Sequence, residues 1–219
     1  ELAKKYYNQG IDEILFLDAV AAYYDRNSLG EIIKNACKDV FVPITVGGGL
    51  RTIEDIKLSL SMGADKVAIN TQAVRNPHFI TNASETFGSQ CIVSSIVAKS
   101  IGNNKWEVYT DNGREPSGID VIEWAQKVES LGAGEILLTS IDKDGTKRGF
   151  DLELNKSVFD VINIPLISGS GAGSDDDIIE LLDYTNTDAI SLSSILHYDL
   201  SDVKKIKKLC KKNLISVRL

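Results

Sequence analysis

Short apolar runs alternate along this chain with longer stretches in which apolar residues recur every three or four positions. Continuous apolar runs are typical of strands buried on both faces, and the longer periodicity is typical of helices with one buried face. Strands that alternate with helices in units of 20–35 residues specify a parallel sheet. The pattern predicts strands at residues 13–17, 44–46, 66–69, 91–97, 135–138, 165–167 and 188–192.

The intervening stretches predict helices, several of which carry signals for their ends. Gly10 stops the first helix, Ser28 with Glu31 three residues later has the pattern of a capping box, and Thr52 precedes another helix. The predicted helices are residues 3–8, 28–38, 53–61, 77–88, 118–130, 152–159, 175–182 and 203–212.

An internal repeat organises the chain. The phrase GIDEILFLD returns as GAGEILLTSIDKDG, so that Glu13 matches Glu135 at an offset of 122 residues. Two more pairs follow in the same order: VGGG with SGAG, where Gly49 matches Gly173, and ADKVAIN with TDAISLS, where Asp65 matches Asp188. Three ordered matches at nearly one spacing indicate a duplicated half-domain.

The repeat also predicts the number of strands. The strand at 91–97 has no counterpart within the sequence, because a shift of about 122 residues reaches either beyond the last helix or before Glu1. We therefore predict an α/β fold, a TIM (β/α)8 barrel of two half-barrels whose first strand is absent from this sequence. Residues 1–219 form one domain with seven of the eight β/α units, and we expect an upstream segment to be missing.

One stretch interrupts the alternation. Lys105–Thr110 alternates polar and apolar residues, and Asp111, Asn112 and Gly113 have the composition of a tight turn between antiparallel strands. We interpret residues 100–113 as a β-hairpin inserted in the loop after the strand at 91–97.

Composition narrows the class of protein. A net charge of −7 argues against nucleic acid or an anionic membrane as the main partner. No apolar run reaches 18 residues, and the three widely spaced cysteines are typical of reduced thiols in a cytoplasmic protein. His78 and His197 have no second ligand at metal-binding spacing, so we expect neither a metal nor a cofactor.

Glycine and hydroxyl residues gather after several predicted strands. Gly49 with Asn70 and Thr71 in the first half correspond to Gly171, Ala172, Ser193 and Ser194, joined by Asp144 and Gly145, in the second. Backbone N–H groups can approach an anion closely at such corners, although glycines also serve merely to turn a chain. Two equivalent cradles predict a substrate with a phosphate at each end.

Carboxylates leave the predicted strands at both ends of the sheet. Asp18 and Asp142 leave symmetric neighbouring strands at the face that carries the chemistry of barrels, and Thr139 could orient substrate or water there. Asp142 and Asp144 could instead cap the following turn. Glu13, Lys66 and Glu135 open otherwise apolar strands at the opposite end. They are either solvated strand starts or, since Glu13 and Glu135 are symmetry mates, part of a charged ring.

The phrases TVGGG, GADKVAINT, TFGSQ, GAGEILLTSIDKDGT and SVRL together make the chain resemble the cyclase subunits of imidazole glycerol phosphate synthase, barrel partners of a glutaminase in histidine biosynthesis. The resemblance covers essentially the whole chain. It implies that ammonia from the glutaminase enters at the bottom of the barrel. At the top it reacts with a bis-phosphorylated ribulosyl aminoimidazole carboxamide nucleotide, giving imidazole glycerol phosphate and an aminoimidazole carboxamide nucleotide.

The resemblance also implies residue roles. Gly49, Asn70 and Thr71 hold one phosphate, and the other is held by Asp144, Gly145, Gly171, Ala172, Ser193 and Ser194. Charged gate residues at the ammonia entrance correspond to Glu13, Lys66 and Glu135. Asp65 corresponds to a contact with the glutaminase, which docks at the N-terminal face of the strands.

The chain departs from the family at a catalytic position. The family's acid–base pair is two aspartates, one on a first strand outside this sequence and one where this chain has Val97. Valine cannot transfer protons, so we predict slow cyclisation. The family's SGG also reads Gly169-Ser170-Gly171 here.

Two other functions remain open from the sequence. One is an ammonia-channel subunit impaired in catalysis that serves a sugar amidotransferase of surface polysaccharide biosynthesis, which Val97 favours. The other is a phosphoribosyl isomerase of the sister barrel family, which fits the duplication but not the phrase GEILLTSID.

Overall fold

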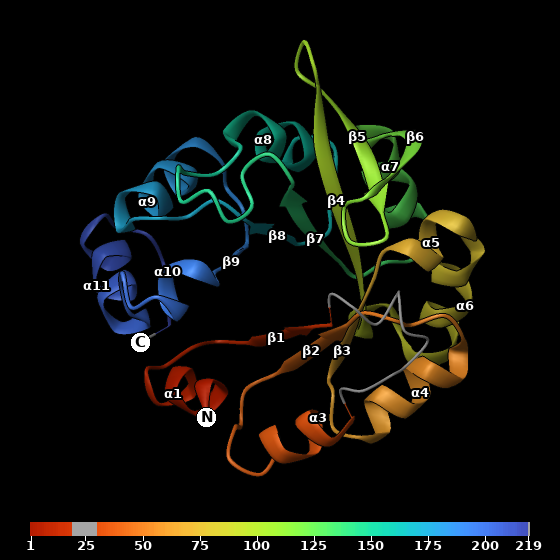
Figure 1. Ribbon diagram of the computed structural model, residues 1–219, viewed down its shortest axis with the longest axis horizontal. Helices are drawn as coiled ribbons and strands as arrows, with labels where there is room; N and C mark the ends of the chain where they lie inside the picture. The colour runs from red at the N-terminus through yellow and green to blue at the C-terminus, as the bar shows by residue number, and fades with distance from the viewer. Residues whose placement is uncertain (19–29, 219) are drawn as a thin grey trace.

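Parallel strands form the centre of the computed structural model, which describes residues 1–18 and 30–218. Among those residues, seven parallel strands pair side by side in chain order, and the helices surround them (Figure 1). The sheet forms a nearly closed α/β barrel of the TIM type, as predicted. Its strands are β1 Ile14–Leu17, β2 Ile44–Gly47, β3 Lys66–Ile69, β4 Ile92–Gly102, β7 Glu135–Ser140, β8 Leu166–Gly169 and β9 Ala189–Ser191.

The helices follow the predicted stretches with small shifts. The predicted cap at Ser28 lies outside the described residues. None of the described helices combines the length and the apolar character that crossing a bilayer requires. The helices are α1 Leu2–Asn8, α3 Gly30–Ala36, α4 Ile53–Ser61, α5 Thr71–Arg75, α6 His78–Phe87, the 3-10 turn η1 Ser89–Cys91, α7 Val121–Ser130, α8 Leu152–Phe159, α9 Asp175–Tyr184, α10 Ser194–His197 and α11 Val203–Lys212.

The main core lies between the sheet and the outer helices. Ile96 and Ile136 from neighbouring strands are fully buried there, beside Trp124 of α7 and Leu154 of α8. Burying one large aliphatic side chain stabilises a fold by about 1.5–3 kcal/mol. Such strands therefore need no polar face, which explains their continuous apolar runs.

Both half-barrels begin a helix with the same capping box. The Thr52 hydroxyl accepts from the backbone N–H of Asp55 at 3.1 Å, and the Asp55 carboxylate accepts from the N–H of Thr52 at 2.9 Å. Ser174 and Asp177 repeat this exchange at 3.3 and 2.8 Å at the start of α9. The repeat in the sequence is thus a repeat of local geometry.

A second pair of equivalent carboxylates binds backbone N–H groups where the strands begin. Asp65 accepts a hydrogen bond from the backbone N–H of Ile44 at 2.8 Å. Asp188, its symmetry mate, accepts one from the N–H of Leu166 at 2.9 Å. Each carboxylate thereby satisfies a strand-end donor on the neighbouring strand.

The antiparallel insertion extends further than predicted. β4 pairs with β5 (Lys105–Thr110), which pairs in turn with β6 (Glu115–Asp120). The prediction that a helix starts at Gly118 is wrong, because Gly118 donates its N–H to the Glu107 carboxylate at 2.6 Å within this antiparallel unit. The cap of α7 is Asp120, whose carboxylate accepts from the N–H of Ile122 at 2.8 Å.

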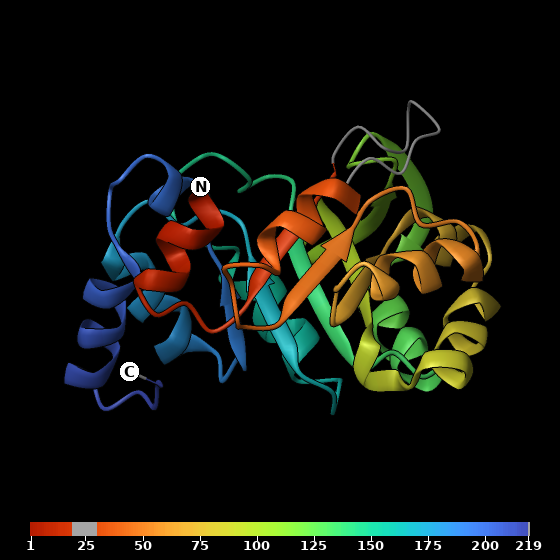
Figure 2. The same ribbon diagram turned by 90° about the horizontal axis from the view of Figure 1, so that it is seen from below.

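Helix α1 packs against the end of the chain, as Figures 1 and 2 show. The Tyr6 ring stacks on His197 with centroids 5.7 Å apart, and its hydroxyl lies 2.5 Å from Nδ1. Lys207 of α11 donates to the carbonyl of Gly10 at 2.6 Å and to Asp12 at 2.7 Å. These contacts connect the start of the described chain to α10 and α11.

Candidate active site

A cavity of about 1260 Å³ occupies the interior of the barrel. Glu13 and Thr45 line it at the end where the strands begin, and Val97, Thr139 and Asp144 line it where they end. A layer of apolar side chains lies between these two polar ends, formed by Leu15, Ala68, Val93, Leu137 and Ile167.

The charged residues at the strand starts form one ion-pair cluster. The Lys66 ammonium donates to Glu13 at 2.9 Å and to Glu135 at 2.7 Å. Thr45 donates its hydroxyl to Glu13 as well. The three charged side chains are only 18–30% exposed, so they are not solvated strand starts. Glu13 and Glu135, which are equivalent in the sequence repeat, thus both pair with the same cation, Lys66.

The pKa of Lys66 reflects two opposing influences. Burial is the largest single influence and lowers it. The hydrogen bonds and negative charges of Glu135 and Glu13 together outweigh burial, so the pKa is raised above the ordinary 10.5. Lys66 is therefore cationic at neutral pH.

Val97 and Thr139 lie together at the centre of the opposite end. They are partners in the register of β4 and β7, and both line the cavity. A Cβ built on Gly113 would lie 3.6 Å from Val97 and 3.2 Å from Ile141. The turn between β5 and β6 therefore covers this apolar point closely.

The first predicted cradle opens into the main cavity. Gly49, Asn70 and Thr71 all line it. The Asn70 amide donates to the carbonyls of Ser95 at 2.9 Å and Tyr109 at 3.2 Å, which fixes its orientation. Sequence reasoning missed that Arg51 and Arg75 line the same cavity, as does Arg218 near the end of the chain.

A hydrogen-bond chain holds this cradle against the turn between β5 and β6. The backbone N–H of Asp111 donates to the Thr71 hydroxyl at 3.0 Å. That hydroxyl donates to the Asn70 amide oxygen at 3.2 Å. Arg75 forms a 3.0 Å ion pair with the Asp111 carboxylate. The insertion after β4 therefore helps to build the barrel mouth.

The second predicted cradle is a small cavity of about 20 Å³ that adjoins the main one, since Asp144 and Ser193 line both. Its lining contains all six residues assigned to the second phosphate: Asp144, Gly145, Gly171, Ala172, Ser193 and Ser194. Lys147, which the sequence analysis did not select, lines it too. The structure thus brings together residues from three separate loops.

The corners after β3 and β9 are equivalent in conformation as well as in sequence. Asn70 has φ −121° and ψ −86°, and Ser193 has φ −128° and ψ −75°. Each leads directly into a short helix, α5 or α10, that the hydrophobic pattern did not predict. Helices of 5 and 4 residues are too short to show a helical period.

The structure separates two of the predicted carboxylates. Asp18 lines the main cavity, but Asp142 lines neither cavity and accepts from the backbone N–H of Ser100 at 2.7 Å. The expectation that these aspartates leave neighbouring strands is wrong, because β2, β3 and β4 lie between β1 and β7. Asp142 instead fastens the loop after β7 to the extended end of β4.

Metal ligands do not gather in the described part of the chain. Across residues 1–18 and 30–218, no three His, Cys, Asp or Glu side chains lie close enough together to hold a metal ion. His197 is engaged by Tyr6, and Cys37, Cys91 and Cys210 are free thiols.

Known proteins resemble this chain over its full length. A family model described as "Histidine biosynthesis protein" matches residues 1–202. A protein of Dehalococcoides mccartyi named "Imidazole glycerol phosphate synthase subunit HisF" is 48% identical over 219 residues, covering 100% of this chain and 86% of the relative. Proteins of the same name from Methanococcus vannielii and Lactococcus lactis are 46% and 47% identical, with 88% and 85% of their own lengths covered.

Proposed function

The chain belongs to the family of histidine biosynthesis proteins and has the function of the cyclase subunit of imidazole glycerol phosphate synthase, and on that premise we propose how its barrel binds substrate and ammonia. The two cradles hold the two phosphates of a bis-phosphorylated ribulosyl aminoimidazole carboxamide nucleotide. The nucleotide lies across the mouth above Val97 and Thr139. The relatives give no support to a sugar-amidating conduit, so the proposal concerns cyclisation alone.

The observation that carries the proposal is the placement of the two cradles. Gly49, Asn70 and Thr71 line the main cavity at one symmetric corner. All six residues assigned to the second phosphate line the small cavity at the other corner. Backbone N–H groups and hydroxyls at such corners can donate hydrogen bonds to phosphate, so a chain of net charge −7 can still bind it locally.

The lower end of the barrel fits the entry of a small neutral molecule. We propose that a glutaminase subunit docks at this N-terminal face in the cytoplasm, with Asp65 at the contact. The Glu13–Lys66–Glu135 cluster stands at the entrance, followed by the apolar layer. Ammonia enters such a layer more readily than ammonium, because desolvating a charge costs far more than desolvating a neutral group. Neutral ammonia can therefore pass beyond the cluster into the apolar layer, whereas ammonium is held back.

Thr139 is the one polar side chain that faces Val97 in the β4–β7 register. In the proposed pose its hydroxyl lies under the reacting part of the nucleotide, where it can donate or accept one hydrogen bond. Valine beside it cannot exchange a proton, so positioning contributes more here than acid–base catalysis.

The test is a direct assay with ammonium salt and the bis-phosphorylated nucleotide, followed by product quantitation. We expect both imidazole glycerol phosphate and the aminoimidazole carboxamide nucleotide. Thr71→Val should raise KM about tenfold, because it removes the hydroxyl that joins Asn70 to Asp111 and thereby holds the first cradle in place. Thr81→Val is the matched control, because Thr81 of α6 donates its hydroxyl to the Leu131 carbonyl after α7 and lines neither cavity. An absence of product while a glutaminase is still stimulated would contradict cyclisation.

A further inference from the structure

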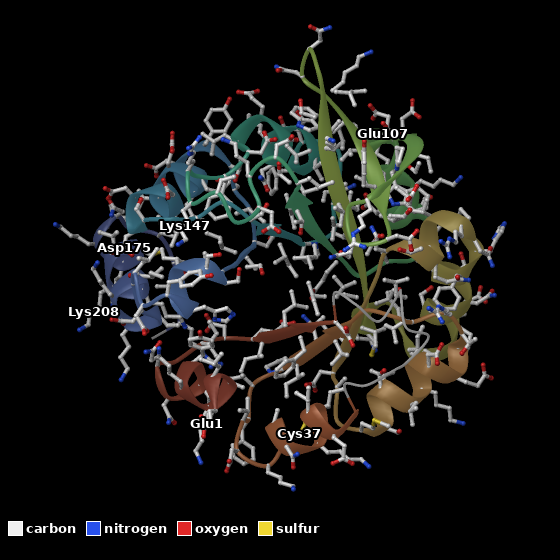
Figure 3. The ribbon with its side chains drawn as sticks, viewed as in Figure 1. Glu1, Cys37, Glu107, Lys147, Asp175 and Lys208 are labelled. Carbon is white, nitrogen blue, oxygen red and sulfur yellow. The ribbon has the colours of Figure 1, made fainter. Side chains whose placement is uncertain are left out.

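We propose that Lys147 supplies the positive charge to the second phosphate, and that the ring of Tyr198 holds its ammonium while the cradle is empty. This inference rests on the proposed function, since it concerns the same small cavity. Figure 3 labels Lys147 on the side of the barrel where the β7–α8 loop and α10 lie. In this proposal the Lys147 ammonium contacts the second phosphate of the substrate directly.

The charge of the cradle calls for a cation. A phosphate monoester carries close to two negative charges at neutral pH, and the carboxylate of Asp144 also lines the cavity. Among the described residues that line it, Lys147 is the single cationic side chain. Backbone donors alone would have to offset both the ligand's charge and that of Asp144.

The backbone of Lys147 is fixed in an unusual conformation. Its φ is +57°, in the left-handed region that few residues other than glycine adopt. A Cβ on Gly173 would lie 2.3 Å from the Lys147 carbonyl oxygen, and one on Gly171 would lie 2.2 Å from the Gly149 carbonyl oxygen. The two loops are thus in close backbone contact. That contact sets where the Lys147 side chain begins.

The Lys147 ammonium lies 4.1 Å from the centroid of the Tyr198 ring. Within residues 1–18 and 30–218, no carboxylate forms an ion pair with it. Tyr198 is 66% exposed, and a cation–π contact at an exposed ring is weak compared with a charge-assisted bond to phosphate. The ammonium can therefore leave the ring when phosphate binds.

Tyr198 follows Ser194 of the cradle by one helical turn. The backbone N–H of Tyr198 donates to the carbonyl of Ser194 at 3.0 Å, and Ser194 lines the cavity. Lys147 lines the same cavity. Both the lysine and the residue that carries the ring are therefore next to the proposed phosphate position.

The experiment is a titration of the ¹⁵N-labelled chain with inorganic phosphate at constant ionic strength. The amide resonance of Ser194 reports the second cradle and that of Thr71 reports the first. We expect Lys147→Gln to weaken phosphate binding at Ser194 about tenfold, the loss of one charge-assisted bond. Binding at Thr71 should be unchanged, which also shows that the variant is folded. Lys147→Arg should restore most of the affinity.

Arg148→Gln is the matched control. It removes the same charge one residue away, from a side chain that lines neither cavity. We expect it to change the Kd at Ser194 less than about twofold. Equal losses for Lys147→Gln and Arg148→Gln would overturn the inference, because they would indicate only the general field of the loop.

Tyr198→Leu tests the resting contact. Removing the ring should tighten phosphate binding at Ser194 about two- to fivefold, because nothing then competes for the ammonium. Weaker binding in this variant would overturn the resting role of Tyr198. If the native chain shows no shift at Ser194, the second cradle itself fails, and the inference fails with it. Normal native binding that Lys147→Gln leaves unchanged overturns the inference alone.

Discussion

Val97 and Thr139 are register partners across β4 and β7, and both face the cavity at the mouth of the barrel. A side chain introduced at position 97 would therefore line the cavity next to Thr139. A titratable group at that position could exchange protons with the nucleotide, which valine cannot do.

We predict that Val97→Asp raises kcat for cyclisation about 10²-fold, the low end of what general acid–base catalysis contributes. Val97→Thr is the control, since it keeps the shape of valine but adds no group that titrates near neutral pH. The measurement is steady-state kinetics with ammonium salt. A similar gain in both variants would show that packing, not proton transfer, limits the native chain.

Removing the cation of the Glu13–Lys66–Glu135 cluster should destabilise the fold. Lys66→Met leaves Glu13 and Glu135 without their shared partner. We expect a loss of about 2–3 kcal/mol in the free energy of unfolding by urea, less than for a fully buried pair. Lys156→Met, which breaks the exposed pair with Asp160, should cost about 0.3–0.5 kcal/mol. Equal losses would indicate that the cluster contributes no more than a surface pair.

The same cluster should give an alkaline dependence of stability. The pKa of Lys66 is raised above its ordinary 10.5 in the folded chain. A raised lysine pKa contributes stability that is fully present below the unfolded value and is lost as pH rises through the folded value. Above pH 10.5, the native chain should therefore lose more stability than Lys66→Met does. Parallel curves for the two proteins, from urea unfolding at each pH, would contradict this.

Asp65 and Asp188 offer an internal comparison of two equivalent carboxylates. Each accepts one strand-end N–H, so Asp65→Ala and Asp188→Ala should each cost about 1.5–3 kcal/mol in the free energy of unfolding. If Asp65 also contacts the glutaminase, only Asp65→Ala should weaken binding of that subunit, measured by calorimetry. A matching loss of glutaminase affinity in Asp188→Ala would place the interface elsewhere.

Arg75 lines the cavity while its ion pair with Asp111 holds it at the first cradle. We predict that Arg75→Gln raises KM for the nucleotide about tenfold and changes kcat little, because it removes a charge that acts on bound phosphate. Lys105→Gln is the control, since that exposed residue of the hairpin lines neither cavity. A fall in kcat at constant KM would assign Arg75 to the chemical step instead.

Much of the fold could be predicted because its signals are local. The apolar runs located the strands, and the Thr52 cap placed α4 with its observed bounds. Local signals failed where the partner was distant or the element was short. The pairing of β6 with β5 cannot be read from Gly118 and its neighbours, and α5 and α10 are too brief to show a period.

The sequence by itself determined the alternating strands and helices of a barrel, because a repeat and a strand period are properties of the chain's order. Only the tertiary structure decided which charges meet. Lys66 and Glu135 are 69 residues apart and come together through sheet order and register. Lys147 joins a cavity that three loops enclose. Such contacts depend on how separate segments pack, and no spacing along the chain encodes that.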